Sequence, residues 1–200
     1  MKTIYPENSI RQFHILNQWD EKLQRMMCTF FAPAINLAYN CWIKLKESDL
    51  MLIAAEQVDK WEFDYKKWGY GLKWVDAVYE YIKHHASARW WKIPTLIKFT
   101  TWDNEEIKLW RERGFSILIG IKVTKQFLTD AKDWKINEYS DYINYKWTDL
   151  AHFTNLIKHF DDKEYINDSY AFNWKREWLY ECNWDEIIED IVMRSKYLFY

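Results

Sequence analysis

The chain has 200 residues, enough for one domain with a sizeable core, and its 28 basic and 30 acidic residues leave a formal net charge of -2. Because like charges form no long block, the composition argues against a nucleic-acid partner and against an acidic tail. No apolar run has the length of a signal peptide or a membrane span, and the three cysteines form no CxxC pair, so we expect no membrane contact, no disulfide framework and a reducing, cytoplasmic compartment.

Residues 1–26 are polar and predict an irregular lead-in, whereas residues 27–42 predict an apolar helix. Apolar side chains recur there at steps of three and four residues and form one broad face: Phe31, Ala34, Ile35, Ala38, Tyr39 and Trp42. Pro33 suits only a position near a helix start, which agrees with Cys28 in the first turn. The positive end of a helix dipole favours thiolate over thiol, so Cys28 suits a nucleophile; a small buried hydrophobic residue is the other interpretation.

Five further elements follow, each marked by its apolar pattern: a helix from Ser48 to Trp61, a helix from about Lys73 to His85, a short strand over Thr95–Thr100, a helix from Asp103 to Gly114, and a buried strand over Phe115–Val123. Ser48 and Asp103 are expected to cap their helices, because a side-chain oxygen there can accept from an unpaired backbone N–H. Aromatic residues make up 20% of the chain, which predicts a core rich in rings or, alternatively, stacking platforms for a sugar or peptide.

The last third of the chain is rich in strand signals. Leu150–Lys158 and Lys163–Asp168 predict two strands joined by a hairpin turn over residues 159–162. Residues 124–147 predict turns with strand fragments, and residues 184–200 predict a final helix, although their β-branched residues also allow a strand.

Helices therefore precede strands, which is typical of an α+β fold with two packed layers. We expect a single domain over residues 1–200, with a helical part over about 27–113 and a β-rich part, ending in a helix, over about 114–200.

The two late strands carry side chains that complement a thiol. His152 opens an apolar strand, and Asp168 ends the next one, so antiparallel pairing would bring the two side chains close together. A nucleophilic thiol needs a base, and the base needs a group that orients its ring. Asn167 is a second candidate for the orienting group, and only one of these two neighbours can point at His152, because adjacent strand residues face opposite sides. Taken alone, His152 is equally a structural histidine at a strand end, and Asp168 a turn-capping carboxylate.

Several stretches resemble the papain-like cysteine peptidases. The similar stretches are Cys28-Thr29-Phe30-Phe31-Ala32 for the nucleophile helix, Ala151-His152 for the histidine segment, Asp168-Ser169-Tyr170 for Asn-Ser-Trp, Gly71 with Ala77, Tyr81 and Ile82, and Gly114 to Ile121. His152 and Asp168 follow Cys28 by 124 and 140 residues, near the family's spacing of roughly 130–150. The chain departs from the family in lacking Cys-Gly-Ser-Cys-Trp and in carrying Asp for Asn.

The resemblance implies a two-lobed fold, with the nucleophile helix in a helical lobe and an antiparallel half-barrel in the other. It implies a Cys28, His152 and Asp168 triad, with Gln18 or, as the alternative, Gln24 stabilising the oxyanion. The implied substrate is an amide bond in a peptide or protein, a peptidoglycan peptide included, and no cofactor or metal is expected. Transglutaminases and peptidoglycan amidases share this residue order, so the reaction subtype stays open.

Two other functions remain open from the sequence. The first is an inactive papain-fold protein that binds a partner or has a structural role in a larger assembly, such as a virion. The second, weaker, is metal binding by His84, His85 or His159. On a helix His84 and His85 would diverge by about 100°, which disfavours joint chelation. Nothing in the sequence indicates an oligomeric state.

Overall fold

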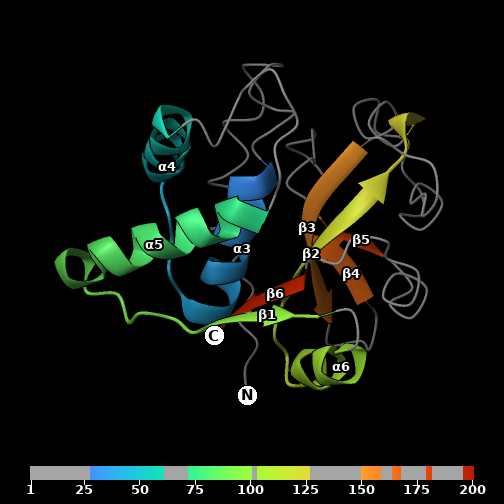
Figure 1. Cartoon of the computed structure of the whole chain (residues 1–200). Helices are drawn as coiled ribbons and strands as arrows, with labels where there is room; N and C mark the ends of the chain where they lie inside the picture. The colour runs from blue at the N-terminus through green and yellow to red at the C-terminus, as the bar shows by residue number, and fades with distance from the viewer. Residues whose placement is uncertain are drawn as a thin grey trace.

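A computed structural model describes residues 28–60, 72–100, 103–126, 150–158, 164–167, 179–181 and 196–200. The described helices are α3 (Cys28–Cys41), α4 (Glu47–Asp59), α5 (Leu72–Arg89) and α6 (Asn104–Glu112). The described strands are β1 (Leu96–Phe99), β2 (Ile117–Val123), β3 (Leu150–Lys158), β4 (Glu164–Asn167), β5 (Leu179–Glu181) and β6 (Lys196–Phe199). The predicted α+β class is confirmed for these parts of the chain (Figure 1).

The described strands form one antiparallel sheet in the order β1-β6-β2-β3-β4-β5. β2 and β3 pair without interruption from Ile117 opposite Leu156 to Val123 opposite Leu150. β3 and β4 pair from Lys158 opposite Glu164 to Asn155 opposite Asn167, so the predicted antiparallel neighbours are confirmed. Lys163, Asp168 and the predicted turn between the strands lie outside the described residues.

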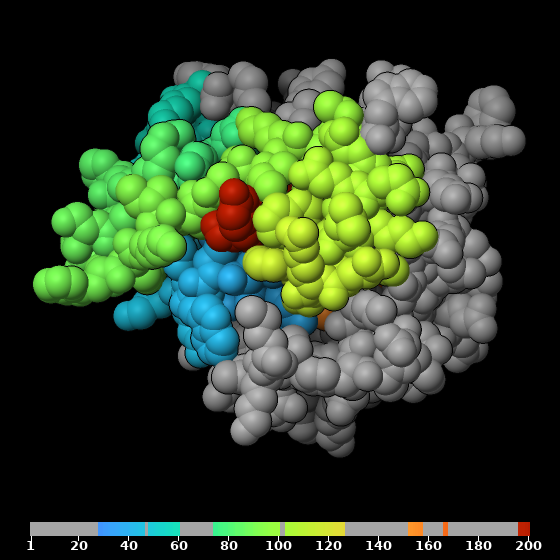
Figure 2. All heavy atoms as spheres, turned by 90° about the horizontal axis from the view of Figure 1, so that it is seen from below, coloured from blue at the N-terminus to red at the C-terminus, as the bar shows by residue number. Residues whose placement is uncertain are grey.

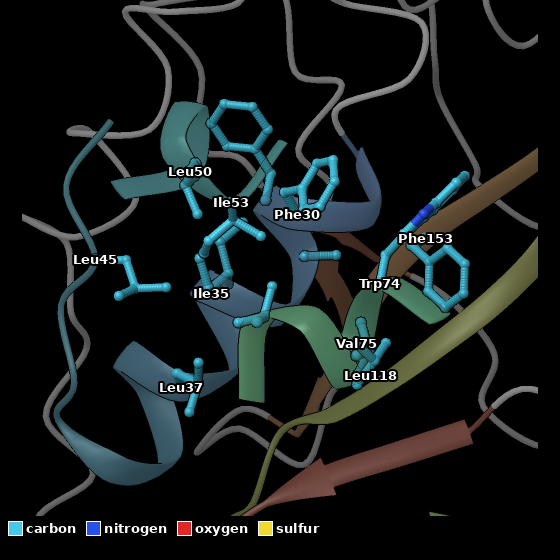
Figure 3. Close-up of a cluster of buried hydrophobic side chains, with 14 of the residues drawn as sticks. Phe30, Ile35, Leu37, Leu45, Leu50, Ile53, Trp74, Val75, Leu118 and Phe153 are labelled. Carbon is cyan, nitrogen blue, oxygen red and sulfur yellow. The ribbon is translucent and has the colours of Figure 1, made fainter. Parts of the chain in front are cut away.

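The two faces of the sheet are covered by different helices. Leu118, Phe153 and Tyr197 join one buried cluster with residues of α3 and α5, so these helices cover their face (Figure 3). Lys196 precedes Tyr197 and therefore points to the other face, where its Nζ donates to Asn104 Oδ1 at 2.5 Å. Asn104 begins α6, so α6 covers this second face.

The core is built around α3. Every residue from Cys28 to Ala38 is buried, because this helix is apolar almost all round and packs between α5 and the sheet. The Phe30 and Trp74 ring centroids lie 6.1 Å apart, and the predicted ring-rich core is confirmed in the described part of the chain. Trp42 and Trp90, which follow α3 and α5, lie outside this core: both have positive φ, and Trp90 is 95% exposed.

The predicted cap at Ser48 is wrong, and the predicted cap at Asp103 has the right position but not the expected side-chain bond. α4 begins at Glu47 rather than after Ser48, and its cap is Lys46, whose backbone N–H donates to Asp49 Oδ2 at 2.7 Å. Asp103 does precede α6, but its carboxylate accepts from the Thr100 backbone N–H instead of from the helix. A carboxylate near a helix start can accept from backbone N–H groups on either side of it in the chain. Asp49 and Asp103 both accept from the backbone N–H three residues before them.

The predicted C-terminal helix is wrong at residues 196–199, which form β6 between β1 and β2. All four residues are buried, so no apolar alternation marks them as a strand. β1 belongs to the part predicted to be helical, over about 27–113, yet it joins the same sheet as the later strands. The predicted boundary near residue 113 therefore does not separate helices from strands. The C-terminal segment reaches the surface beside the α3, α5–β1 and α6 regions (Figure 2).

Within the described ranges, no helix combines the length and the apolar character that crossing a membrane requires.

Candidate active site

A buried hydrogen-bond network aligns α3 with β3. The Asn155 amide donates to the Ala32 carbonyl at 2.9 Å, and the Asn36 amide donates to Asn155 Oδ1 at 3.1 Å and to the Ser116 carbonyl at 2.8 Å. Ser116 directly precedes the β2 residue that pairs with Leu156. From Ala32 to Asn36 the contacts thus move toward the C-terminal end of β3, so α3 and β3 run in the same direction (Figure 1).

This alignment brings the start of α3 and the start of β3 to one end of the molecule. Cys28 is one helical turn, about 6 Å, before Ala32. His152 is three strand residues, about 10 Å, before Asn155. Both candidate residues therefore lie beyond the network in the same direction.

Strand alternation, however, directs His152 to the other face. Phe153 and Asn155 contact the α3 side, as the buried cluster and the hydrogen bonds establish. His152 lies in the opposite phase and pairs with Ile121, which is buried but outside the cluster that contains Cys28. His152 thus shares an end with the thiol but points toward the α6 side of the sheet.

Cys28 and His152 are both buried, at 5% and 1% exposure. The Cys28 thiol belongs to an apolar cluster with Phe30 and Trp74. Cys41, at the other end of α3, is half-buried, and burial raises the pKa of its thiol to about 12. Cys41 is therefore an unreactive thiol on the same helix.

Asn167 has the wrong phase to orient His152. It pairs with Asn155 and so points to the α3 face. Its amide is buried, and neither amide atom has a hydrogen-bond partner in the described part of the chain. Asp168, Gln18 and Gln24 lie outside the described residues, so the triad and the oxyanion glutamine stay predictions.

The sequence interpretation missed Asn36, Ser116 and Asn155. Besides its contacts to β2 and β3, Asn36 accepts from the Phe199 backbone N–H of β6 at 3.1 Å. Asn40 adds a bond to the Ser116 carbonyl at 2.9 Å and accepts from the Ser116 N–H at 2.8 Å. The sequence did contain a signal for this network: Asn36 and Asn155 each lie inside an apolar run. An amide that is buried with such a run requires hydrogen-bond partners.

The histidine pair on α5 is packed against an aromatic ring, and no third metal ligand is grouped with it among the described residues. The His84 and His85 rings meet edge to face at 4.9 Å, and His85 lies against the Tyr81 ring at 4.3 Å. Among the described residues, no three His, Cys, Asp or Glu side chains are grouped closely enough to hold a metal ion. His159 lies outside these residues.

Comparisons with protein-family models, with curated proteins and with solved structures gave no match, so the resemblance to papain-like peptidases rests on the residues quoted above.

Proposed function

We propose that the chain is a cysteine hydrolase of amide bonds with a papain-like, two-lobed fold. Cys28 is the nucleophile, His152 the base and Asp168 the group that orients the imidazole. Gln18, or alternatively Gln24, stabilises the oxyanion together with the Cys28 backbone N–H. The substrate is a peptide, a protein or a peptidoglycan peptide.

One observation carries this proposal, the parallel alignment of α3 and β3. We expect Cys28 at the start of its helix, where backbone N–H groups would stabilise a thiolate and an oxyanion, and the parallel alignment puts His152 of β3 at the same end of the molecule as Cys28. The alignment rests on the Asn155 bond to Ala32 and the Asn36 bonds to Asn155 and Ser116. These asparagines are therefore positioning residues for the proposed chemistry.

The proposed reaction has two steps. His152 takes the thiol proton, Cys28 Sγ attacks the amide carbonyl, and the protonated imidazole gives the proton to the leaving amine. Water then attacks the thioester with His152 as base, which releases the acid and restores the thiol. The first step requires an imidazole nitrogen within about 3 Å of Sγ. Because His152 and Phe153 differ in phase, this step requires the imidazole to leave the α6 side of the sheet.

A second candidate is the inactive binding or structural protein. The burial of Cys28 at 5% exposure in an apolar cluster favours it, because reactive thiols are at least partly accessible. Under this alternative, Cys28 contributes only to packing.

Thiol labelling separates the two candidates. We expect iodoacetamide to label Cys28 below pH 7 in the native protein, with peptide mass spectrometry resolving each cysteine from pH 5 to 9. His152→Ala should remove this reactivity, whereas His84→Ala, which replaces an exposed histidine on α5, should leave it unchanged. Cys41 is the internal control and should stay unlabelled up to pH 9, because burial raises its pKa to about 12.

Labelling of Cys28 only after unfolding by urea, in the unmodified protein and both variants, would contradict the hydrolase and favour the inactive protein. Circular dichroism on each variant confirms that the comparison is made on folded chains.

A further inference from the structure

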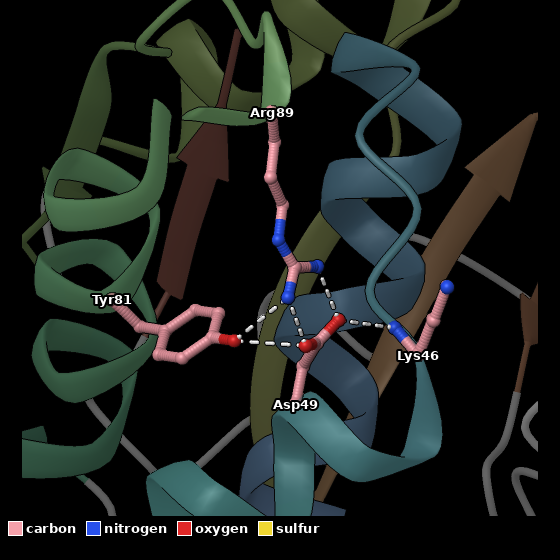
Figure 4. Close-up of polar contacts among 4 residues, drawn as sticks. All are labelled: Lys46, Asp49, Tyr81 and Arg89. Atoms are coloured by element: carbon pink, nitrogen blue, oxygen red, sulfur yellow. Dashed lines mark hydrogen bonds and ion pairs between the residues drawn. The ribbon is translucent and has the colours of Figure 1, made fainter. Parts of the chain in front are cut away.

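Helices α4 and α5 are joined by a buried carboxylate. Asp49 accepts from Arg89 Nη1 at 2.7 Å, from Arg89 Nη2 at 2.5 Å, from the Tyr81 hydroxyl at 2.8 Å and from the Lys46 backbone N–H (Figure 4). Burial alone would raise the pKa of Asp49, but the bonds from Arg89, Lys46 and Tyr81 more than offset it and hold the pKa below its ordinary value. The ionised Asp49 thus fixes the two helices relative to each other.

A cavity of about 430 Å³ lies between the same two helices. Its lining includes Glu56 and Gln57 from α4, Lys60 directly after α4, and Asp76, Glu80 and His84 from α5. The volume falls in the range of about 300–1,000 Å³ that is typical of small-molecule sites.

Carboxylates outnumber ammonium groups in this lining. Asp76 is paired with Lys98 at 2.6 Å and Glu80 with Lys83 at 2.7 Å, and neither lysine belongs to the lining. No lysine or arginine within the described ranges forms an ion pair with Glu56. Glu56 is therefore a carboxylate available to a cationic ligand.

The burial of Gln57 in the cavity lining is an observation independent of the charges. Its side chain lines the cavity and is only 4% exposed, yet no group in the part of the chain that the structure describes hydrogen-bonds it. The Gln57 amide is reachable only through the cavity that it lines, so a ligand N–H bound there can donate to its carbonyl oxygen.

We propose that the α4–α5 cavity is a binding site for a small aliphatic polyamine in its ammonium form. One ammonium group pairs with Glu56 and donates to the Gln57 carbonyl. A second ammonium group, on the same flexible chain, lies against the α5 carboxylates Asp76 and Glu80, which it shares with the exposed lysines Lys98 and Lys83. An anionic ligand would meet three carboxylates, and a purely apolar ligand would leave Gln57 unpaired. The site is independent of Cys28 and of the proposed hydrolysis.

Spermidine titrated into the full chain by isothermal calorimetry tests the proposal. We expect saturable binding that Glu56→Gln and Gln57→Leu each weaken by about tenfold, the effect of losing one charge-assisted contact. Glu105→Gln, which removes the same charge from an exposed position on α6, should change the affinity by less than about twofold, since exposed distant charges are screened.

A lysine side chain presents the same ammonium group, so a trilysine peptide is titrated in parallel. Tighter binding of the peptide, with the same response to Glu56→Gln, supports the ammonium site and identifies its source as a peptide.

The proposal is overturned if spermidine does not bind, or if Glu56→Gln and Glu105→Gln weaken binding equally, which indicates attraction by overall charge alone. Because Glu56 is exposed, its replacement is compatible with folding. The calorimetric titration of Glu56→Gln therefore tests the proposal even if Gln57→Leu unfolds the chain.

Discussion

Two buried asparagines lie opposite each other on neighbouring strands and differ only in their partners. Asn155 donates to Ala32 and accepts from Asn36, whereas neither amide atom of Asn167 has a partner among the described residues. A buried amide stabilises a fold only when it is hydrogen-bonded. The two residues should therefore respond in opposite ways to the same substitution.

We expect Asn155→Leu to lower the free energy of unfolding by about 2–4 kcal/mol, because it leaves the Ala32 carbonyl and the Asn36 amide unpaired in the core. Asn167→Leu should be neutral or stabilising by about 1 kcal/mol, because it removes an amide that gains nothing from burial. Urea unfolding of both variants measures the difference. Equal destabilisation by the two substitutions would contradict the network.

At the level of elements, one ionised side chain joins α4 to α5. Asp49 is bonded by Arg89, Tyr81 and the Lys46 backbone, and its side chain is 2% exposed in the ion pair with Arg89. The same carboxylate raises the pKa of Tyr81 to about 12, after the larger contribution of burial. A change at Asp49 thus affects both helices.

Asp49→Asn should lower the free energy of unfolding by about 2–4 kcal/mol at pH 7, because it leaves Arg89 partly buried without its counter-charge. The folded-state pKa of Asp49 is lowered, so its stabilisation is present above the ordinary value near 4 and is lost as the pH falls below it. The difference between the two proteins should therefore shrink below about pH 4.

Asp76→Asn is the matched control. Its ion pair with Lys98 is exposed, and we expect a cost below about 1 kcal/mol. Guanidinium-induced unfolding at pH 7 and pH 3 measures both variants, and a pH-independent cost of Asp49→Asn would refute the ionic role.

For the whole molecule, the last strand closes the sheet. β6 lies between β1 and β2, and the backbones of Thr95 and Tyr200 bond each other in both directions, at 2.8 and 3.0 Å. Phe199, which is fully buried, packs in the cluster with α3, and its ring centroid lies 6.2 Å from that of Tyr79. The C-terminal residues are thus part of the core and not an appendage.

Phe199→Ala should lower the melting temperature strongly, with a cost of about 3–5 kcal/mol, because it leaves a cavity where β6 meets α3. Tyr200→Ala keeps the backbone bonds to Thr95 and removes a ring that is 45% exposed, so it should cost less than about 1 kcal/mol. Calorimetry compares the two. A small effect of Phe199→Ala would contradict the central position of β6.

Local sequence patterns were sufficient to predict several of the helices and strands. The apolar repeat predicted the helix that the structure describes over Cys28–Cys41, and the runs that became β2, β3 and β4 were recognised as strands. The order of helices and strands predicted the α+β class. Each of these features depends on residues that are close in the chain, where the period of the apolar side chains acts directly.

Contacts between distant residues account for the rest. Residues 196–199 became a strand because β1 and β2 supply partners on both sides, and no period within four buried residues encodes that. The phase of His152 depends on which face of β3 the α3 helix covers, and the partners of Asn36 and Asn155 lie about 80 to 160 residues away. The cavity beside Gln57 lies between two helices that are joined by Asp49 and Arg89, which are 40 residues apart in the chain.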